Sequence, residues 1–299
     1  MNKNMRARVD LIDGFLGAGK TTFIKKYMKY LDERGISYMV LENEFGAAGV
    51  DASILGGNVR ELTGGCICCG QKVNFHNLLI EMAGQAERII VEPSGIFNAD
   101  DFFDIMDSPQ VREAAVCGMM VGIVDPFSLD GLTEQDGQVL YSELISCGAI
   151  LISRTDRADA RTIESAQEKL RAMLGGLPPV FDAREADFGR LMACGPVRRA
   201  HERMRRDHST LFQSAVMYPE GIYDEASLRR AAQRLLSGEA GSVMRVKGTV
   251  RSEDGFLFVN AAGEDLVTGE AAEAPALNVI GRGLKRKEIR RILQEEAKA

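Results

Sequence analysis

The chain of 299 residues contains no apolar run of the roughly 20 residues that a membrane-spanning helix needs. The residues before the first expected strand also lack the apolar stretch that is typical of a signal peptide. Internal repeats and low-complexity tracts are missing as well. We therefore expect a cytoplasmic protein that has no membrane among its partners.

Basic residues are in the minority, since 37 Lys and Arg stand against 43 Asp and Glu, a net charge of −6. This balance argues against nucleic acid as a partner. One local basic run, Arg198–Arg206, is interpreted as a solvated helix face rather than a nucleic-acid patch. With three histidines in all, the chain contains no histidine-rich metal store.

The chain does contain enough apolar sequence for a packed core, because 45% of its residues are hydrophobic and 27% are charged. Its length suggests about two domains. Three of its six cysteines lie within four positions, an arrangement unlike the disulfide framework of a secreted protein. A reduced, cytoplasmic environment is the simplest interpretation.

A glycine-rich segment, Gly14–Thr21, fits the phosphate-binding pattern G-x-x-x-x-G-K-[ST] at every fixed position. An expected strand, Arg8–Asp13, precedes it, and an amphipathic helix, Thr22–Leu31, follows it. The glycines allow backbone N–H groups to approach phosphate oxygens, and the helix N-terminus adds further donors. A glycine-rich turn without a ligand is the alternative, but strand, loop and helix all agree with the motif.

Individual residues of this segment have expected roles. Lys20 should reach the β- and γ-phosphates, and the Thr21 hydroxyl should bind Mg²⁺. The residues expected to bind the nucleotide here are Gly14, Gly17, Ala18, Gly19, Lys20, Thr21 and Thr22.

Three thiols lie close together at Cys66, Cys68 and Cys69. Core packing does not explain them, because adjacent side chains diverge, whereas thiolate sulfur suits Zn²⁺ and other soft or borderline ions. Three thiolates leave a fourth tetrahedral position, for which Glu42, His76, water or a ligand from a client are candidates. We expect an exchangeable site; a redox-active cluster and inert buried thiols are the alternatives. The cysteines expected in the core are Cys117, Cys147 and Cys194.

Near-continuous apolar segments predict buried parallel strands at Val9–Ile12, Tyr38–Leu41, Arg88–Val91, Met119–Val124, Ala149–Ile152 and Val180–Phe181. Helical patterns lie between them at Leu78–Ala86, Gln138–Ile145 and Ile163–Leu174. Strands that alternate with helices indicate an α/β domain with a mostly parallel sheet. Ligands of such sheets bind at the carboxyl ends of the strands.

We place this α/β domain at residues 1–185 and a charged helical linker at 186–212. Residues 213–299 are expected to form a smaller α+β domain with a mostly antiparallel sheet. Its expected elements are strands near Ser214–Tyr218, Val243–Arg251, Phe256–Asn260 and Leu277–Ile280, and helices at Glu225–Leu236 and from about Lys285. The segment Glu253–Gly255 predicts a hairpin turn.

With these segments assembled, the chain resembles the CobW-type (CobW/HypB/UreG) family of GTPases, relatives of the nickel-insertion GTPases for hydrogenase and urease. The resemblance is carried by Gly14–Thr22, Glu42–Gly46, Gly64–Cys69, Glu92–Gly95, Arg245–Gly248 and Val279–Arg282. It extends over nearly the whole chain and implies a P-loop NTPase domain followed by the family's C-terminal domain. It also implies handling of zinc, cobalt or a related metal, which some members deliver to a client enzyme.

The resemblance assigns roles to two glutamates. Glu42 matches the family's acidic position before the switch segment, where it would complete the metal site. Glu92 begins a Walker B-like E-x-x-G, so its carboxylate would hold the Mg²⁺ shell or orient the attacking water. Together with Lys20, these glutamates form the expected catalytic set; a helix cap or a surface charge is the alternative for each glutamate. Asp125 also ends a strand, but it fits a turn and helix start equally well.

Ser153–Asp156 stands where the family carries [NT]-K-x-D. Asp156 would accept two hydrogen bonds that guanine can donate and adenine cannot, and Arg154 would cover a face of the purine. The sequence departs from the family pattern at two positions, with serine at 153 and arginine at 154. The degree of selectivity for GTP over ATP therefore stays open.

We expect a metallochaperone with Mg²⁺-dependent GTPase activity, whose cofactors are GTP, Mg²⁺ and Zn²⁺, or Co²⁺ or another divalent transition metal in place of zinc. GTP binding and hydrolysis would control how tightly the thiol site holds its metal. The expected partner is a client metalloprotein, and a homodimer is one option. The two alternatives are a small-molecule kinase with a structural zinc and a metal-responsive scaffold protein with GTP as a structural ligand.

Overall fold

The computed structural model describes residues 6–15, 17–43, 59–62, 72–93, 99–130, 132, 134–176, 178–184, 186–197, 213–263, 265–271 and 275–298. These residues form two compact units, with residues 6–197 in the first and 213–298 in the second. None of the helices in this part of the chain is long and apolar enough to cross a membrane.

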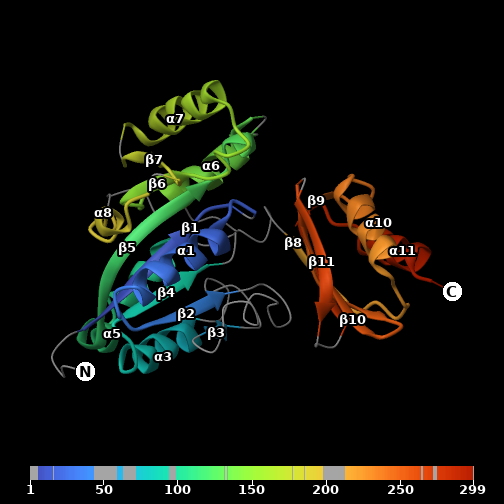
Figure 1. Ribbon diagram of the computed structural model, residues 1–299, viewed down its shortest axis with the longest axis horizontal. Helices are drawn as coiled ribbons and strands as arrows, with labels where there is room; N and C mark the ends of the chain where they lie inside the picture. Colours follow the sequence, from blue (N-terminus) through green and yellow to red (C-terminus); the bar gives the residue numbers. More distant parts are fainter. Residues whose placement is uncertain are drawn as a thin grey trace. The chain divides into compact units, whose positions relative to one another are not determined.

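The first unit is built on a sheet of seven parallel strands (Figure 1). In order across the sheet, they are β3 (Val59–Leu62), β2 (Tyr38–Asn43), β4 (Arg88–Glu92), β1 (Ala7–Asp13), β5 (Ala115–Val124), β6 (Ala149–Ile152) and β7 (Val180–Asp182). The central strands are buried along most of their length, as their near-continuous apolar sequences predict. The expected parallel α/β architecture is therefore confirmed.

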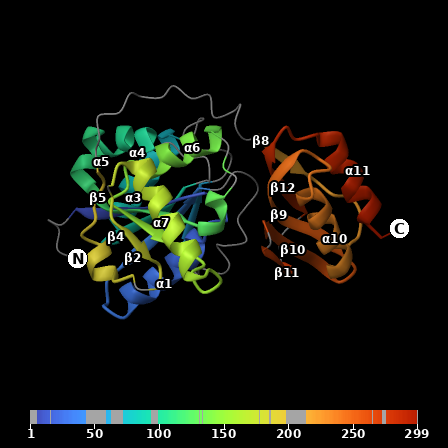
Figure 2. The same ribbon diagram turned by 90° about the horizontal axis from the view of Figure 1, so that it is seen from above.

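Helices cover both faces of this sheet (Figure 2). On one face lies α1 (Lys20–Asp32), whose apolar side chains join strand residues in one buried cluster. On the other face lie α3 (Lys72–Ala83), α4 (Ala99–Met106) and α5 (Pro109–Ala114). Further helices are a 3₁₀ helix at Pro126–Leu129, α6 (Glu134–Leu144), α7 (Ala160–Leu174) and α8 (Phe188–Leu191).

Strand β1 lies where the chain changes direction across the sheet. After β1 the chain passes to β2 and β3 at one edge, and after the neighbouring β5 it passes to β6 and β7 at the other. Open α/β sheets bind ligands in the crevice beyond the carboxyl ends of the strands at such a point. The phosphate-binding motif begins directly after β1, so the topology places it in this crevice.

The described part of the expected linker, residues 186–197, belongs to the first unit. The ring of Phe188 in α8 lies with its centroid 5.4 Å from those of both Phe23 and Tyr27 in α1. Asp187 caps this short helix by accepting hydrogen bonds from the N–H groups of Gly189 and Arg190. These contacts attach the segment to the face of the sheet that α1 covers.

A buried ion pair joins β1 to β4 inside the first unit. Arg88 Nη1 donates to both carboxylate oxygens of Asp10, at 2.7 and 2.6 Å, and only 6% of the Arg88 side chain and 0% of that of Asp10 are exposed. The Tyr27 hydroxyl and the Met119 N–H also donate to Asp10, at 2.9 and 2.7 Å. Although burial acts in the opposite direction, the Asp10 carboxylate raises the pKa of Arg88. A Cβ at Gly118 would collide with Asp10, so this glycine makes room for the pair.

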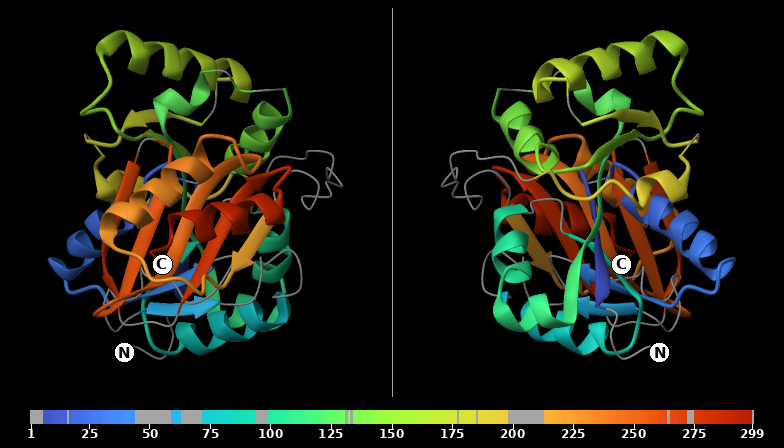
Figure 3. Two further views of the ribbon diagram at one scale, coloured as in Figure 1. Left: turned by 90° about the vertical axis from the view of Figure 1, so that its right-hand side faces the viewer. Right: turned by 90° about the vertical axis from the view of Figure 1, so that its left-hand side faces the viewer.

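The second unit is a five-stranded antiparallel sheet with two helices on one face (Figure 3). Its strand order is β11 (Asp265–Ala271), β10 (Gly255–Ala262), β9 (Ser242–Ser252), β12 (Ala276–Arg282) and β8 (Gln213–Met217). Helices α10 (Glu225–Leu236) and α11 (Arg286–Glu296) lie side by side and share one buried cluster with the sheet. The expected hairpin is confirmed, because β9 and β10 pair from Ser252 and Gly255.

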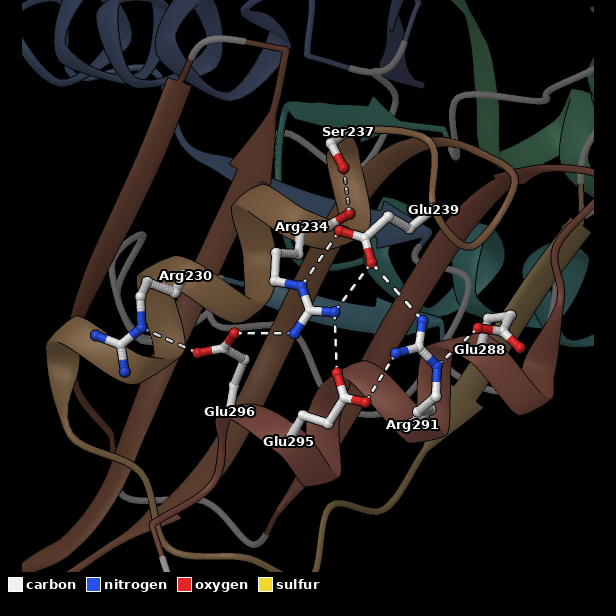
Figure 4. A network of polar contacts seen from close by, with 8 residues as sticks. All are labelled: Arg230, Arg234, Ser237, Glu239, Glu288, Arg291, Glu295 and Glu296. Carbon is white, nitrogen blue, oxygen red and sulfur yellow. Dashed lines mark hydrogen bonds and ion pairs between the residues drawn. The ribbon is translucent and has the colours of Figure 1, made fainter.

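A network of ion pairs joins α10 to α11 (Figure 4). Arg234 on α10 lies 3.0 Å from the carboxylates of both Glu295 and Glu296 on α11, and 2.9 Å from that of Glu239. Arg291 closes the network at 2.7 Å from Glu295. Hydrogen bonds to Glu239, Glu296 and Glu295 raise the pKa of Arg234. Since exposed pairs contribute little one by one, the network acts mainly by fixing how the two helices lie against each other.

Candidate functional site

The phosphate-binding motif adopts a loop that requires its glycines. Gly14 has a φ of 137°, and a Cβ there would collide with the carbonyl oxygen of Ile123 in β5. Gly17 and Gly19 also have positive φ values, of 79° and 100°, and Gly19 precedes the first turn of α1. The loop therefore runs tightly along the end of β5 and delivers the chain to the helix N-terminus, where N–H groups are available to an anion.

Lys20 lies folded back over this loop. Its Nζ donates to the carbonyl oxygens of Gly14 and Phe15, at 2.7 and 3.3 Å, and only 6% of the residue is exposed. These acceptors are neutral, whereas phosphate oxygens would form shorter, charge-assisted hydrogen bonds with the same ammonium group. The loop therefore holds the Lys20 ammonium group at a position where it could exchange these carbonyl acceptors for the oxygens of a bound phosphate.

Glu92 links Thr21 to Glu42 at this edge of the sheet. The Thr21 hydroxyl donates to Glu92 Oε1 and Oε2, at 3.0 and 3.2 Å. Glu42 and Glu92 are paired residues on the adjacent strands β2 and β4, and Glu42 is 2% exposed. A hydroxyl and a carboxylate beside a phosphate loop are the hard oxygen donors that Mg²⁺ takes together with phosphates and water. This donor set fits Mg²⁺.

The motif at Ser153–Asp156 follows β6 and reaches the phosphate loop through Arg154. Arg154 Nη2 donates to the carbonyl oxygen of Gly17 at 2.8 Å, and its Nε lies 3.1 Å from Asp125 Oδ2. The Ser153 hydroxyl donates to the carbonyl oxygen of Val124 at 3.2 Å, which ties the motif to β5. The Asp156 side chain is 73% exposed. The base-reading candidates and the phosphate loop therefore occupy one edge of the sheet.

The sequence did not reveal a second set of connected hydrogen bonds beside this motif. The Thr155 hydroxyl donates to Asp182 Oδ1 at 2.7 Å, and Arg184 Nη2 donates to Asp182 Oδ2 at 2.7 Å. Although partial burial acts against it, hydrogen bonds from Arg184 and Thr155 lower the pKa of Asp182. The available signal was the position of Asp182 at the end of β7, which is the rule that identified the other site residues.

Asp13, the last residue of β1, is a further site residue that the sequence reading passed over. It is fully buried beneath the loop, and its Oδ1 accepts the Gly14 N–H at 2.8 Å. Its Oδ2 has no hydrogen-bonding partner among the described residues. Burial raises the pKa of Asp13 to about 6, against the opposing effects of the Gly14 N–H and Lys20. The base of the phosphate loop therefore contains a buried carboxyl group whose pKa lies above the usual value for aspartate.

The expected thiol ligands Cys66, Cys68 and Cys69 lie outside the described residues. Within the part of the chain that the structure describes, no group of three or more His, Cys, Asp or Glu side chains could hold a metal ion. Glu42 is placed at the end of β2 and His76 within α3. The three thiols therefore stay the predicted core of the metal site.

The three cysteines that were expected in the core differ in their surroundings. Cys147 is buried, and burial, with Asp13 and Glu143 nearby, raises its pKa well above the usual value. Cys117 and Cys194 are half-buried. The raised pKa makes Cys147 a poor nucleophile and metal ligand.

Comparison with protein families gives two matches that together span both units. The model of the CobW/HypB/UreG nucleotide-binding domain matches residues 8–181. The model of the cobalamin synthesis protein cobW C-terminal domain matches residues 212–296.

Individual relatives are similar along most of their length. The chain is 25% identical over 291 residues to "Zinc chaperone YeiR" of Escherichia coli (strain K12), covering 87% of each chain. It is 24% identical over 279 residues to "Zinc chaperone CobW" of Sinorhizobium sp, covering 82% of this chain and 78% of that one. A solved structure, the Zn(II)-bound YjiA GTPase from E. coli, is 21% identical with a TM-score of 0.45 over 100% of both chains. The two family matches, which extend from the phosphate loop to the last helix, establish that this chain belongs to the CobW/HypB/UreG family and carries a CobW C-terminal domain.

Proposed function

We propose that this chain is a GTP-hydrolysing metallochaperone that binds zinc through Cys66, Cys68 and Cys69 and passes it to a client protein according to its nucleotide state. Family membership supports the GTPase part, and the relatives named as zinc chaperones support zinc over cobalt. Both the thiol motif and the phosphate loop fall within the matched nucleotide-binding domain.

The observation that carries this proposal is the row formed by Thr21, Glu92 and Glu42, in which Glu92 contacts Thr21 on one side and is the strand partner of Glu42 on the other. Thr21 donates to Glu92 within 3.0 Å, and Glu92 is paired with Glu42 across neighbouring parallel strands, which lie about 5 Å apart. Thr21 belongs to the proposed Mg²⁺ site and Glu42 to the proposed zinc site. A change in phosphate occupancy at one end of the row therefore acts directly beside a metal ligand at the other.

The proposed mechanism begins with Lys20 leaving the carbonyl oxygens of Gly14 and Phe15 for the β- and γ-phosphates. Thr21 and Glu92 would hold Mg²⁺, which when bound would neutralise charge on the phosphates during hydrolysis. The Glu92 carboxylate would also be able to orient the attacking water. Once the γ-phosphate has left, Lys20 loses a phosphate contact, and the Glu92 carboxylate would shift beside Glu42. The two nucleotide states then hold the thiol loop differently.

Guanine recognition is assigned to Asp156, with the Arg154 stem and guanidinium on the purine face. The exposed Asp156 carboxylate has room to accept the N1–H and N2–H₂ groups of guanine. Adenine offers no such pair of donors, so a carboxylate left unsatisfied disfavours it.

Competition binding with steady-state hydrolysis tests this assignment. GTP is expected to displace labelled GDP at a concentration at least about tenfold lower than ATP, because two hydrogen bonds to a charged group are involved. The Asp156→Ala variant is expected to lose this preference while it still binds triphosphate through the loop. Equal displacement by GTP and ATP in the wild type would contradict the assignment of guanine recognition to Asp156. Absence of phosphate release with Mg²⁺ present would contradict the proposed GTP hydrolysis.

A further inference from the structure

Arg154 is held in an unusual backbone conformation by two separate contacts. Its φ is 52°, and it is the one non-glycine residue with positive φ in the part of the chain that the structure describes. Left-handed backbone of this kind is unfavourable for a side chain with a Cβ and persists where surrounding contacts enforce it. Here, two contacts are made by neighbouring nitrogens of the guanidinium: Gly17 on the phosphate loop accepts from Nη2, and Asp125 faces Nε.

Asp125 uses its two carboxylate oxygens for different tasks. Oδ1 accepts the N–H of Phe127 at 3.0 Å and so caps the 3₁₀ helix Pro126–Leu129. Oδ2 lies 3.1 Å from Arg154 Nε, and the Asp125 and Arg154 side chains are only 15% and 20% exposed. The cap fixes the position of the carboxylate, and the carboxylate in turn fixes one edge of the guanidinium. An ion pair that is largely shielded from water is stronger than an exposed one.

We propose that Asp125 is a positioning residue of the nucleotide site, which holds the planar Arg154 guanidinium in place as a preformed wall for the purine base. The inference rests on the proposed function, because it takes the base to lie against Arg154. Asp125 itself need not touch the nucleotide. It neutralises the guanidinium and limits its rotation, so that the base meets a rigid flat surface and less side-chain entropy is lost on binding.

This arrangement gives a reason for arginine where the family pattern has lysine. The contacts to Gly17 and Asp125 use two different nitrogens of one rigid fork. Lysine has one nitrogen at its tip in place of a rigid fork, and it has no plane to present to a base. Lysine at position 154 would therefore leave the Asp125 carboxylate without its guanidinium partner.

The test replaces Asp125 with asparagine. Asparagine still accepts the Phe127 N–H and so preserves the helix cap, but its neutral amide cannot also serve as an anionic acceptor for Nε. Binding of GDP and of inorganic tripolyphosphate is measured for each variant by calorimetry. We expect Asp125→Asn to weaken GDP binding about tenfold, as loss of one charged hydrogen bond implies, and to change tripolyphosphate binding less than about twofold.

Two further variants make the result specific. Asp130→Asn, at the other end of the same 3₁₀ helix, removes an exposed aspartate that pairs with Lys169 at 2.6 Å, and it is expected to change neither affinity. Arg154→Lys removes both the flat surface and the pair with Asp125, so it is expected to weaken GDP binding at least as much as Asp125→Asn. The double variant is expected to be no weaker than Arg154→Lys alone, since Asp125 acts through Arg154.

Equal losses for GDP and tripolyphosphate in Asp125→Asn would overturn the inference, because Asp125 would then only brace the phosphate loop. Unchanged GDP binding would overturn it as well. Failure of the proposed function looks different: wild-type protein would bind tripolyphosphate but neither GDP nor GTP.

Discussion

Replacing Arg88 with methionine is expected to lower the free energy of unfolding of the first unit by about 3–5 kcal/mol. Methionine has a similar apolar volume, but it leaves the Asp10 carboxylate, which is 0% exposed, without its cation. The remaining donors, the Tyr27 hydroxyl and the Met119 N–H, are neutral and cannot compensate a buried charge. Urea unfolding followed by circular dichroism measures the effect, and hydrogen exchange in β1 and β5 reports on this unit alone.

Two companion variants show whether the uncompensated charge is the cause. Lys169→Met breaks a surface pair whose side chains are 45% and 72% exposed, and it is expected to change stability by less than about 1 kcal/mol. Adding Asp10→Asn to Arg88→Met removes the orphaned charge, and the amide oxygen can still accept the Met119 N–H, so the double variant is expected to restore part of the loss. If Arg88→Met were as mild as Lys169→Met, the buried pair would not hold β1 to β4.

Replacing Asp13 with asparagine is expected to change how stability depends on pH. Burial raises the pKa of Asp13 to about 6, so the native protein keeps a proton that the unfolded chain has already released above its ordinary value of 3.8. Between these values the folded state binds more protons, and stability therefore falls as pH rises. The contribution of Asp13 to the free energy of unfolding is fully present below about pH 4 and is lost above about pH 6. It amounts to on the order of 3 kcal/mol.

Asparagine at position 13 does not titrate, but its amide oxygen can still accept the Gly14 N–H. The measurement is the difference in free energy of unfolding between wild type and Asp13→Asn across this pH range, which cancels the other titrating groups. We expect the wild type to lose stability relative to the variant as pH rises. A difference that stayed level, or that moved in favour of the wild type, would show that Asp13 is not a protonated carboxyl at the base of the loop.

Local sequence patterns were sufficient for the strong elements of the fold. The central strands and the hairpin at Ser252–Gly255 were predictable because apolar runs and turn residues act over a few positions. Strands β3 and β11 were missed, and each lies at an edge of its sheet with one neighbour. Their sequences, VREL and DLVTGEA, contain charged residues and few strand formers, so pairing with the neighbouring strand determines their structure.

The candidate site likewise contains residues that were predictable from a short sequence segment and contacts that were not. The loop with Lys20 and Thr21 was predictable because its chemistry lies within one short segment. The pairing of Glu42 with Glu92 was not, because it depends on β4 entering the sheet between β1 and β2. Asp125 looked like a turn residue, and it is one, but its second oxygen faces Arg154, 29 positions further along the chain. Contacts of this kind come from topology rather than from periodicity.

The most direct test of the central claim is the affinity for zinc of anaerobically purified protein, measured with a non-hydrolysable GTP analogue, with GDP and without nucleotide. Coupling between nucleotide and metal predicts that the affinities with the analogue and with GDP differ by at least about fivefold. The Cys66→Ala, Cys68→Ala, Cys69→Ala variant should lose both the tight binding and its response to nucleotide. Identical zinc affinities in all three states of the wild type would contradict nucleotide-controlled metal transfer.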